Sequence, residues 1–92
     1  MLGAGAIGGF NMNFSEALES LKLGSKLQRE GWNGKGMFIE LVPANGWAKL
    51  FGNTTDYGNL PFIGMKTADN KFVPWLASQT DILAEDWSIL LD

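Results

Sequence analysis

The sequence predicts an α+β domain, with a short N-terminal helix followed by an antiparallel sheet of about four strands. Three observations favour this class. Apolar residues recur at helical spacing over residues 14–23, they alternate with a period of two over residues 37–42, and turn-forming residues separate the later apolar segments. A chain of 92 residues with 46% hydrophobic residues is expected to form one globular domain with a modest core.

The predicted helix covers residues 14–23. Its apolar residues lie at the first, fourth, fifth and eighth positions, which share one face of a helix. Asn13 is suited to cap the first turn, and Glu16 three residues later completes the pattern of a capping box. Gly24 stands where a helix commonly ends in a left-handed residue.

The first half of the sheet is less regular. Residues 26–30 are short and polar, and they fit either a strand or a helical turn. Residues 31–36 contain three glycines and predict a loop. Residues 37–42 alternate as a strand does, and Pro43 ends them. Residues 44–59, rich in glycine and asparagine, are expected to form variable loops.

The second half predicts a hairpin and a final strand. Residues 60–67 and 72–75 are expected to be strands joined by a turn at 68–71, where Asp and Asn accept left-handed backbone. Pro74 cannot donate to a neighbouring strand and therefore indicates a sheet edge or a bulge. A helical turn capped by Ser78 is expected within residues 78–86, followed by an apolar strand over residues 87–91.

The N-terminal segment differs in character from the rest. Residues 1–11 are interpreted as a flexible Gly/Ala-rich extension, and residues 12–92 as the ligand-binding domain. Residues 3–8 match G-x-G-x-x-G, but no strand precedes them and strands and helices do not alternate after them. A dinucleotide fold is therefore not expected.

Composition narrows the function classes. The chain contains no histidine and no cysteine, which excludes Ser–His, Cys–His and His–zinc chemistry. A net charge of −3 argues against a duplex DNA binder, and no stretch has the length of a membrane span. We expect a non-enzymatic cytoplasmic protein without metal or cofactor. Any anion-binding surface is expected around Lys26, Arg29 and Lys35.

Two of the four tryptophans are candidates for stacking on a base. Trp32 lies in the glycine-rich loop, and Trp75 ends a strand before the polar run 77–81. Each has a structural alternative, because Trp32 also suits the end of a small core and Trp75 a core position beside a helix cap. Trp87 is expected in the core. The carboxylates Asp81, Glu85 and Asp86 are interpreted as a solvated acidic turn.

Two long motifs stand out in the sequence. They are R-x-G-W-N-G over residues 29–34 and V-P-W-L-A-S-Q-T-D-x-L-A-E-D-W over residues 73–87. Together they resemble a phage and prophage family, the second type of Thoeris anti-defence protein, and the resemblance extends from Met12 to about Ser88. Shorter matches lie at residues 12–18, 36–38, 41–43, 60–61 and 65–69.

The resemblance implies a sponge that binds a cyclic ADP-ribose isomer made by TIR-domain proteins and does not cleave it. Some family members also sequester cyclic oligonucleotide signals of CBASS immunity. The resemblance also implies a homotetramer, with ligand pockets where protomers meet. Two alternatives stay open: hydrolysis of the signal by Asp81 or Glu85, and direct protein-binding inhibition of a defence protein through the tail and Trp47.

The motifs also imply a set of ligand-binding residues. Trp32 and Trp75 would line the adenine. Arg29 and Asn33 suit phosphate or ribose contacts. The second motif adds three hydrogen-bonding residues for the hydroxyl and phosphate side, namely Ser78, Thr80 and Asp81.

Overall fold

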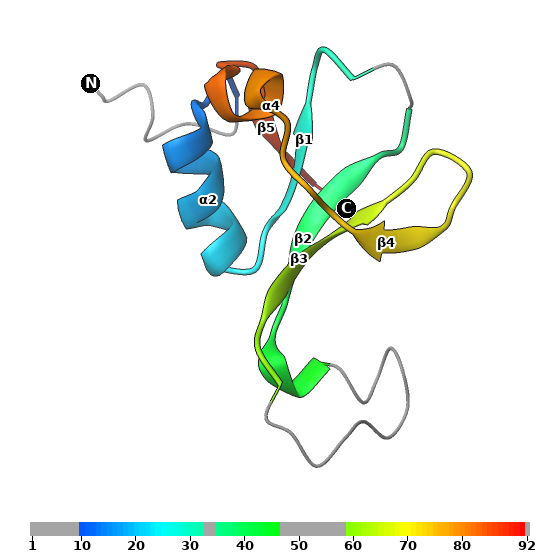
Figure 1. The fold of residues 1–92 in the computed structure, drawn as a ribbon. Coiled ribbons are helices and arrows are strands. Elements are labelled where there is room, and N and C mark those ends of the chain that lie inside the picture. Colours follow the sequence, from blue (N-terminus) through cyan, green and yellow to red (C-terminus); the bar gives the residue numbers. More distant parts are fainter. Residues whose placement is uncertain (1–9, 33–34, 47–58, 92) are drawn as a thin grey trace.

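An antiparallel five-stranded sheet with a helix packed against it forms the protein in the computed structural model, which describes residues 10–32, 35–46 and 59–91 (Figure 1). The strand order is β4-β3-β2-β1-β5. The α+β class and the short N-terminal helix are confirmed. The elements are α2 (Phe14–Lys22), β1 (Lys26–Arg29), β2 (Phe38–Val42), η1 (Ala44–Gly46), β3 (Phe62–Lys66), β4 (Phe72–Pro74), α4 (Gln79–Leu83) and β5 (Trp87–Leu90).

Helix α2 begins with the predicted capping box. The Asn13 side chain accepts from the backbone N–H of Glu16 at 2.9 Å, and the Glu16 carboxylate accepts from the backbone N–H of Asn13 at 2.9 Å. Two donors that a helix N-terminus leaves unpaired are thereby satisfied. The helix ends at Lys22, one residue before the predicted end, and Gly24 follows with a φ of 99°.

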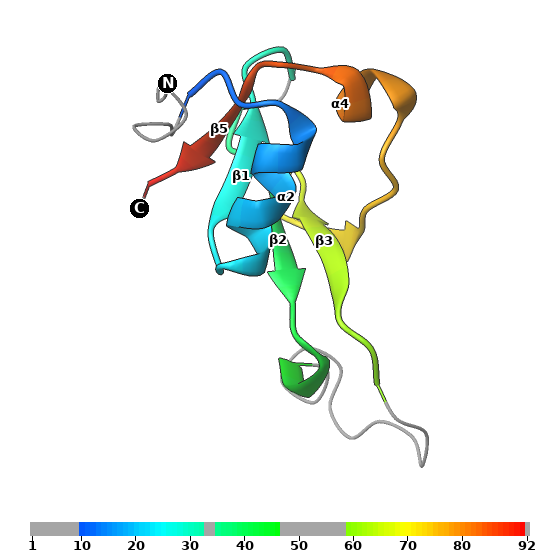
Figure 2. The ribbon, with the colours of Figure 1, turned by 90° about the vertical axis from the view of Figure 1, so that its left-hand side faces the viewer.

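The core lies between α2 and the sheet. Figure 2 shows α2 in front of the sheet, and the helix packs on β1, β2 and β5. In strands β1 and β2, Leu27 and Ile39 are opposite one another and fully buried. The buried cluster consists of Met12, Ala17, Leu21, Leu27, Ile39 and Trp87.

Strand β1 lies within residues 26–30, for which the sequence allowed either a strand or a helical turn. It is a strand because it pairs on both sides, with β2 through Leu27 and with β5 through four consecutive residue pairs. The Arg29–Trp87 pair belongs to this register, so the final tryptophan is placed beside Arg29. The sheet consequently has one strand more than the sequence indicated.

The two edge strands are treated differently. Pro74 lies in β4, at one edge, which confirms the edge interpretation. At the other edge, β5 is covered at Trp87 by Met12, which exchanges two backbone hydrogen bonds with it at 2.9 and 3.1 Å. Met12 is thus part of the folded domain. Of the expected N-terminal extension, only Phe10 and Asn11 fall within the described residues, and both are exposed.

The remaining predicted turns are present. Asn70 has a φ of 67° in the β3–β4 hairpin, as expected for a turn at 68–71. Ser78 caps α4. Within residues 44–59, Ala44–Gly46 form η1, and residues 47–58 lie outside the described part. No helix in the described ranges is long and apolar enough to cross a membrane.

Candidate functional site

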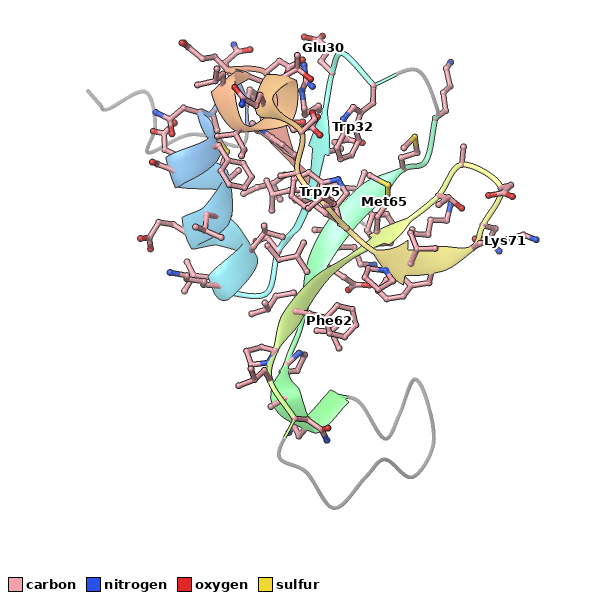
Figure 3. All side chains as sticks on the ribbon, in the orientation of Figure 1. Glu30, Trp32, Phe62, Met65, Lys71 and Trp75 are labelled. Atoms are coloured by element: carbon pink, nitrogen blue, oxygen red, sulfur yellow. The ribbon has the colours of Figure 1, made fainter. Side chains whose placement is uncertain are left out.

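Aromatic rings gather around Trp87 at the end of the sheet nearest α4. Trp87 is fully buried, and Trp32 and Trp75 each meet its ring nearly at a right angle, with ring centroids 5.3 and 6.0 Å away. Phe14 of α2 completes this aromatic cluster of four rings, with its ring centroid 5.6 Å from that of Trp87. Figure 3 shows Trp32 arriving from the loop after β1 and Trp75 from the segment after β4. Both keep part of their surface exposed.

A polar network lies directly against these rings. Arg29 bonds two carboxylates, from Nη1 to Oδ1 of Asp81 and from Nε to Oδ1 of Asp86, both at 2.8 Å. The same Oδ1 of Asp81 accepts from Trp32 Nε1 at 3.2 Å. The positive charge of Arg29 and the negative charges of Asp81 and Asp86 sum to a local charge of −1. The network therefore favours a ligand group that donates hydrogen bonds over a phosphate group.

The N-terminus of α4 is bound into the same network. Ser78 Oγ accepts from the backbone N–H of Asp81 at 3.1 Å, and Asp81 Oδ2 accepts from the backbone N–H of Ser78 at 3.2 Å. Ser78 Oγ also shares a hydrogen bond of 2.8 Å with Thr80 Oγ1. The backbone carbonyl of Asp81 accepts from Trp87 Nε1 at 2.9 Å. The capping box thus links α4 to β5 and to the loop after β1.

Comparisons with known proteins identify the family to which the segment with these motifs belongs. The family model described as Thoeris anti-defense 2-like domain matches residues 12–90. The chain belongs to the Thoeris anti-defense 2-like family. It is also 50% identical over 86 aligned residues to Thoeris anti-defense 2 of Bacillus phage SP01, covering 86% of this chain and 94% of that protein. The general role of the chain is therefore phage anti-defence against Thoeris.

In this member of the Thoeris anti-defense 2-like family, both motifs meet in one place. Trp32 and Arg29 of the first motif contact Asp81 of the second directly. Trp75 joins them through Trp87. The predicted ligand residues Ser78 and Thr80 lie at the N-terminal end of α4 next to Asp81, Ser78 as the N-cap and Thr80 in the first turn. Asn33 lies outside the described residues.

The structure corrects one interpretation of side chains and adds to another. The stretch taken as a solvated acidic turn has one exposed carboxylate, Glu85, whereas Asp81 is buried and Asp86 is half-buried. Trp87, confirmed as a core residue, is also the ring that both candidate tryptophans contact. Asp81 stands three residues after Ser78, a capping-box spacing that points to a structural role before any ligand is considered.

A hollow of about 340 Å³ lies on the face of the sheet away from α2. Two carboxylates line it, Glu30 and Asp86, and they make it unsuited to a phosphate group. The full lining is Phe10, Asn11, Gln28, Glu30, Asp86 and Ser88. The candidate tryptophans do not line this hollow, so it is a different place from the aromatic cluster.

The network shifts the acidities of its members. Burial raises the pKa of Asp81, but hydrogen bonds from Arg29, Trp32 and Ser78 together outweigh burial and hold that pKa below its ordinary value. The pKa of Asp86 is lowered chiefly by its hydrogen bond from Arg29. The pKa of Arg29 is raised, chiefly by its hydrogen bond to Asp86. All three groups are charged at neutral pH.

These pKa directions predict the dependence of stability on acid. Because Asp81 and Asp86 have lower pKa values in the folded state, their contribution is complete above the unfolded pKa of about 4 and is lost as the pH falls toward the folded values. Urea unfolding followed by circular dichroism should give a midpoint that declines below about pH 4. The double variant Asp81→Asn/Asp86→Asn should be less stable at pH 7, and its urea midpoint should fall less steeply than that of the wild type as the pH drops below about 4. An equally steep fall of the midpoint in the two proteins would contradict this assignment.

Proposed function

We propose that the protein binds and sequesters a cyclic ADP-ribose isomer, made by TIR-domain proteins in the host cytoplasm, without cleaving it. One observation carries the proposal. Trp32 and Trp75, from two motifs far apart in the sequence, flank the same buried indole and stay partly exposed. An aromatic face held in place by a rigid core is the surface on which a purine base stacks, with a gain of about 1–3 kcal/mol per base.

The polar network is matched to the sugar side of such a ligand. Arg29 is held by two carboxylates, so its charge is already compensated within the chain. Ribose hydroxyls donate to carboxylates, whereas a diphosphate would be repelled by the local negative charge. We therefore place the adenine and its ribose at the aromatic cluster, beside Arg29 and the partly exposed Asp86. The diphosphate would lie farther away, toward the basic side chains of the first half of the chain or toward another protomer.

Hydrolysis of the signal is less compatible with these carboxylates. A general acid has to hold a proton at neutral pH, which requires a raised pKa. Asp81, one of the two carboxylates considered for hydrolysis, has a lowered pKa, as does Asp86, and both are engaged by Arg29. The other carboxylate considered, Glu85, is exposed. The chain also contains no histidine and no cysteine to take over that role. Binding without chemistry therefore requires fewer assumptions.

The proposal includes a homotetramer. Large apolar side chains are exposed on the segment from Trp75 through α4: Leu76 is 91% exposed and Leu83 is 75% exposed. A second copy docked there would cover this apolar surface and would close the open side of Trp75. Light scattering at micromolar concentration is expected to give a mass near four chains, and Leu76→Ser/Leu83→Ser is expected to reduce it. A monomeric wild type would contradict the assembly but leave ligand binding to be measured separately.

Calorimetry against purified cyclic ADP-ribose isomers and CBASS cyclic oligonucleotides tests the function directly. We expect tight binding of at least one isomer, and recovery of that isomer unchanged after incubation and denaturation of the protein. Recovery of a hydrolysed product would identify an enzyme instead. Failure to bind any probe, together with capture of a TIR protein or its effector in a ligand-free pull-down, would identify a protein-binding inhibitor.

A further inference from the structure

Asp81 occupies an unusual position for a carboxylate. Among the described residues it is the buried charged side chain, with 9% of its surface exposed. Its Oδ1 accepts from Arg29 Nη1 and Trp32 Nε1, its Oδ2 accepts from the backbone N–H of Ser78, and its backbone carbonyl accepts from Trp87 Nε1. One residue thus connects the two long sequence motifs with each other and with Trp87, the central ring of the aromatic cluster.

The contact with Trp32 fixes the orientation of a ring. The edge-to-face contact with Trp87 restrains the Trp32 indole from one side, at an interplanar angle of 81°. The Nε1–H bond to Asp81 restrains it at a second point. A planar side chain held at two points has few remaining orientations, and the entropy lost when it orders on a ligand is correspondingly small.

We propose that Asp81 is a positioning residue, which holds the Trp32 indole in the orientation that stacks on the ligand and does not itself contact the ligand. The inference rests on the proposed function in one respect, that Trp32 stacks on a base. It changes the role that the sequence motif implied for Asp81, from a ligand contact to a support behind the ligand-binding surface. Asp86 provides a matched comparison, since it bonds Arg29 at the same 2.8 Å and no bond joins its side chain to Trp32 among the described contacts.

A ligand-free measurement tests the positioning alone. In ¹⁵N-labelled protein, the indole N–H resonance of Trp32 is identified by its loss in Trp32→Phe. Asp81→Asn is expected to shift this resonance and to speed its hydrogen exchange, and Asp86→Asn is expected to change it less. The Trp87 indole N–H, which bonds the backbone carbonyl of Asp81, is the internal control and should stay in place. Equal movement of both resonances, or of neither, would overturn the proposal.

A double-variant cycle tests the consequence for binding, with purified cyclic ADP-ribose isomers as probes. Asp81→Asn is expected to raise the dissociation constant about tenfold in the wild-type background. In the Trp32→Phe background, where the side chain keeps a ring but has no N–H to be held, the increase is expected to be less than about threefold. The same loss in both backgrounds would mean that Asp81 touches the ligand, and the proposal would fail.

The two arms separate the possible failures. If the wild type binds no probe, the proposed function fails, while the resonance of Trp32 still tests the positioning. If Asp81→Asn does not fold, hydrogen exchange in the wild type carries the test: slow exchange of the Trp32 indole N–H is expected, and exchange at the rate of an exposed indole would overturn the proposal.

Discussion

Trp87→Ala is expected to leave the protein largely unfolded at room temperature. Trp87 is fully buried and is surrounded by Phe14, Trp32 and Trp75. Truncating a core tryptophan costs about 3–5 kcal/mol, and the freed carbonyl of Asp81 would lose its partner at a cost of about 1–3 kcal/mol. The stability of small domains is about 5–15 kcal/mol, with the smallest at the lower end.

Thermal and urea unfolding by circular dichroism measure this loss. Trp87→Phe is the matched control, because it keeps most of the ring contacts and removes only the indole N–H and part of the volume. We expect it to fold with a clearly lowered melting temperature. If Trp87→Ala melted within a few degrees of the wild type, the aromatic cluster would not be the centre of this core.

Trp32→Ala and Trp75→Ala are expected to produce the largest losses of affinity. Removing one stacking face costs about 1–3 kcal/mol, which corresponds to about one to two decades in the dissociation constant. Both side chains also pack on Trp87, so each variant should lose some stability as well, though less than Trp87→Ala because both are only partly buried. Affinity is expected to change more than the fold does.

A control for lost packing comes from Phe14, which borders Trp75 and Trp87 from α2 and has no part in the proposed stack. Phe14→Ala should lower the melting temperature by an amount comparable to Trp75→Ala and weaken binding much less. Calorimetry with the isomer that binds the wild type, and melting without ligand, are measured for all three variants. Unchanged affinity in both tryptophan variants would refute the stacking assignment.

Local hydrogen bonding explains which elements the sequence predicted well. The caps at Asn13 and Ser78 join residues three positions apart, so the donor and the acceptor can be read from neighbouring positions. The turn at Asn70 depends on the backbone preference of one residue type. In contrast, residues 26–30 have no distinctive local pattern, and their strand exists because β2 and β5 pair with it.

The sequence by itself determined the family, the α+β class, the helix caps and the identity of the two tryptophans proposed to stack. Only the tertiary structure decided what surrounds them. Arg29 pairs with carboxylates 52 and 57 positions away, and Trp32 reaches Asp81 49 positions away. Those partners are set by the placement of β5 beside β1 and by the path of the chain into α4, which local patterns of residues do not encode. The roles proposed for Arg29 and Asp81 therefore depend on strand order, because the charge that a side chain offers to a ligand depends on which neighbours have already compensated it.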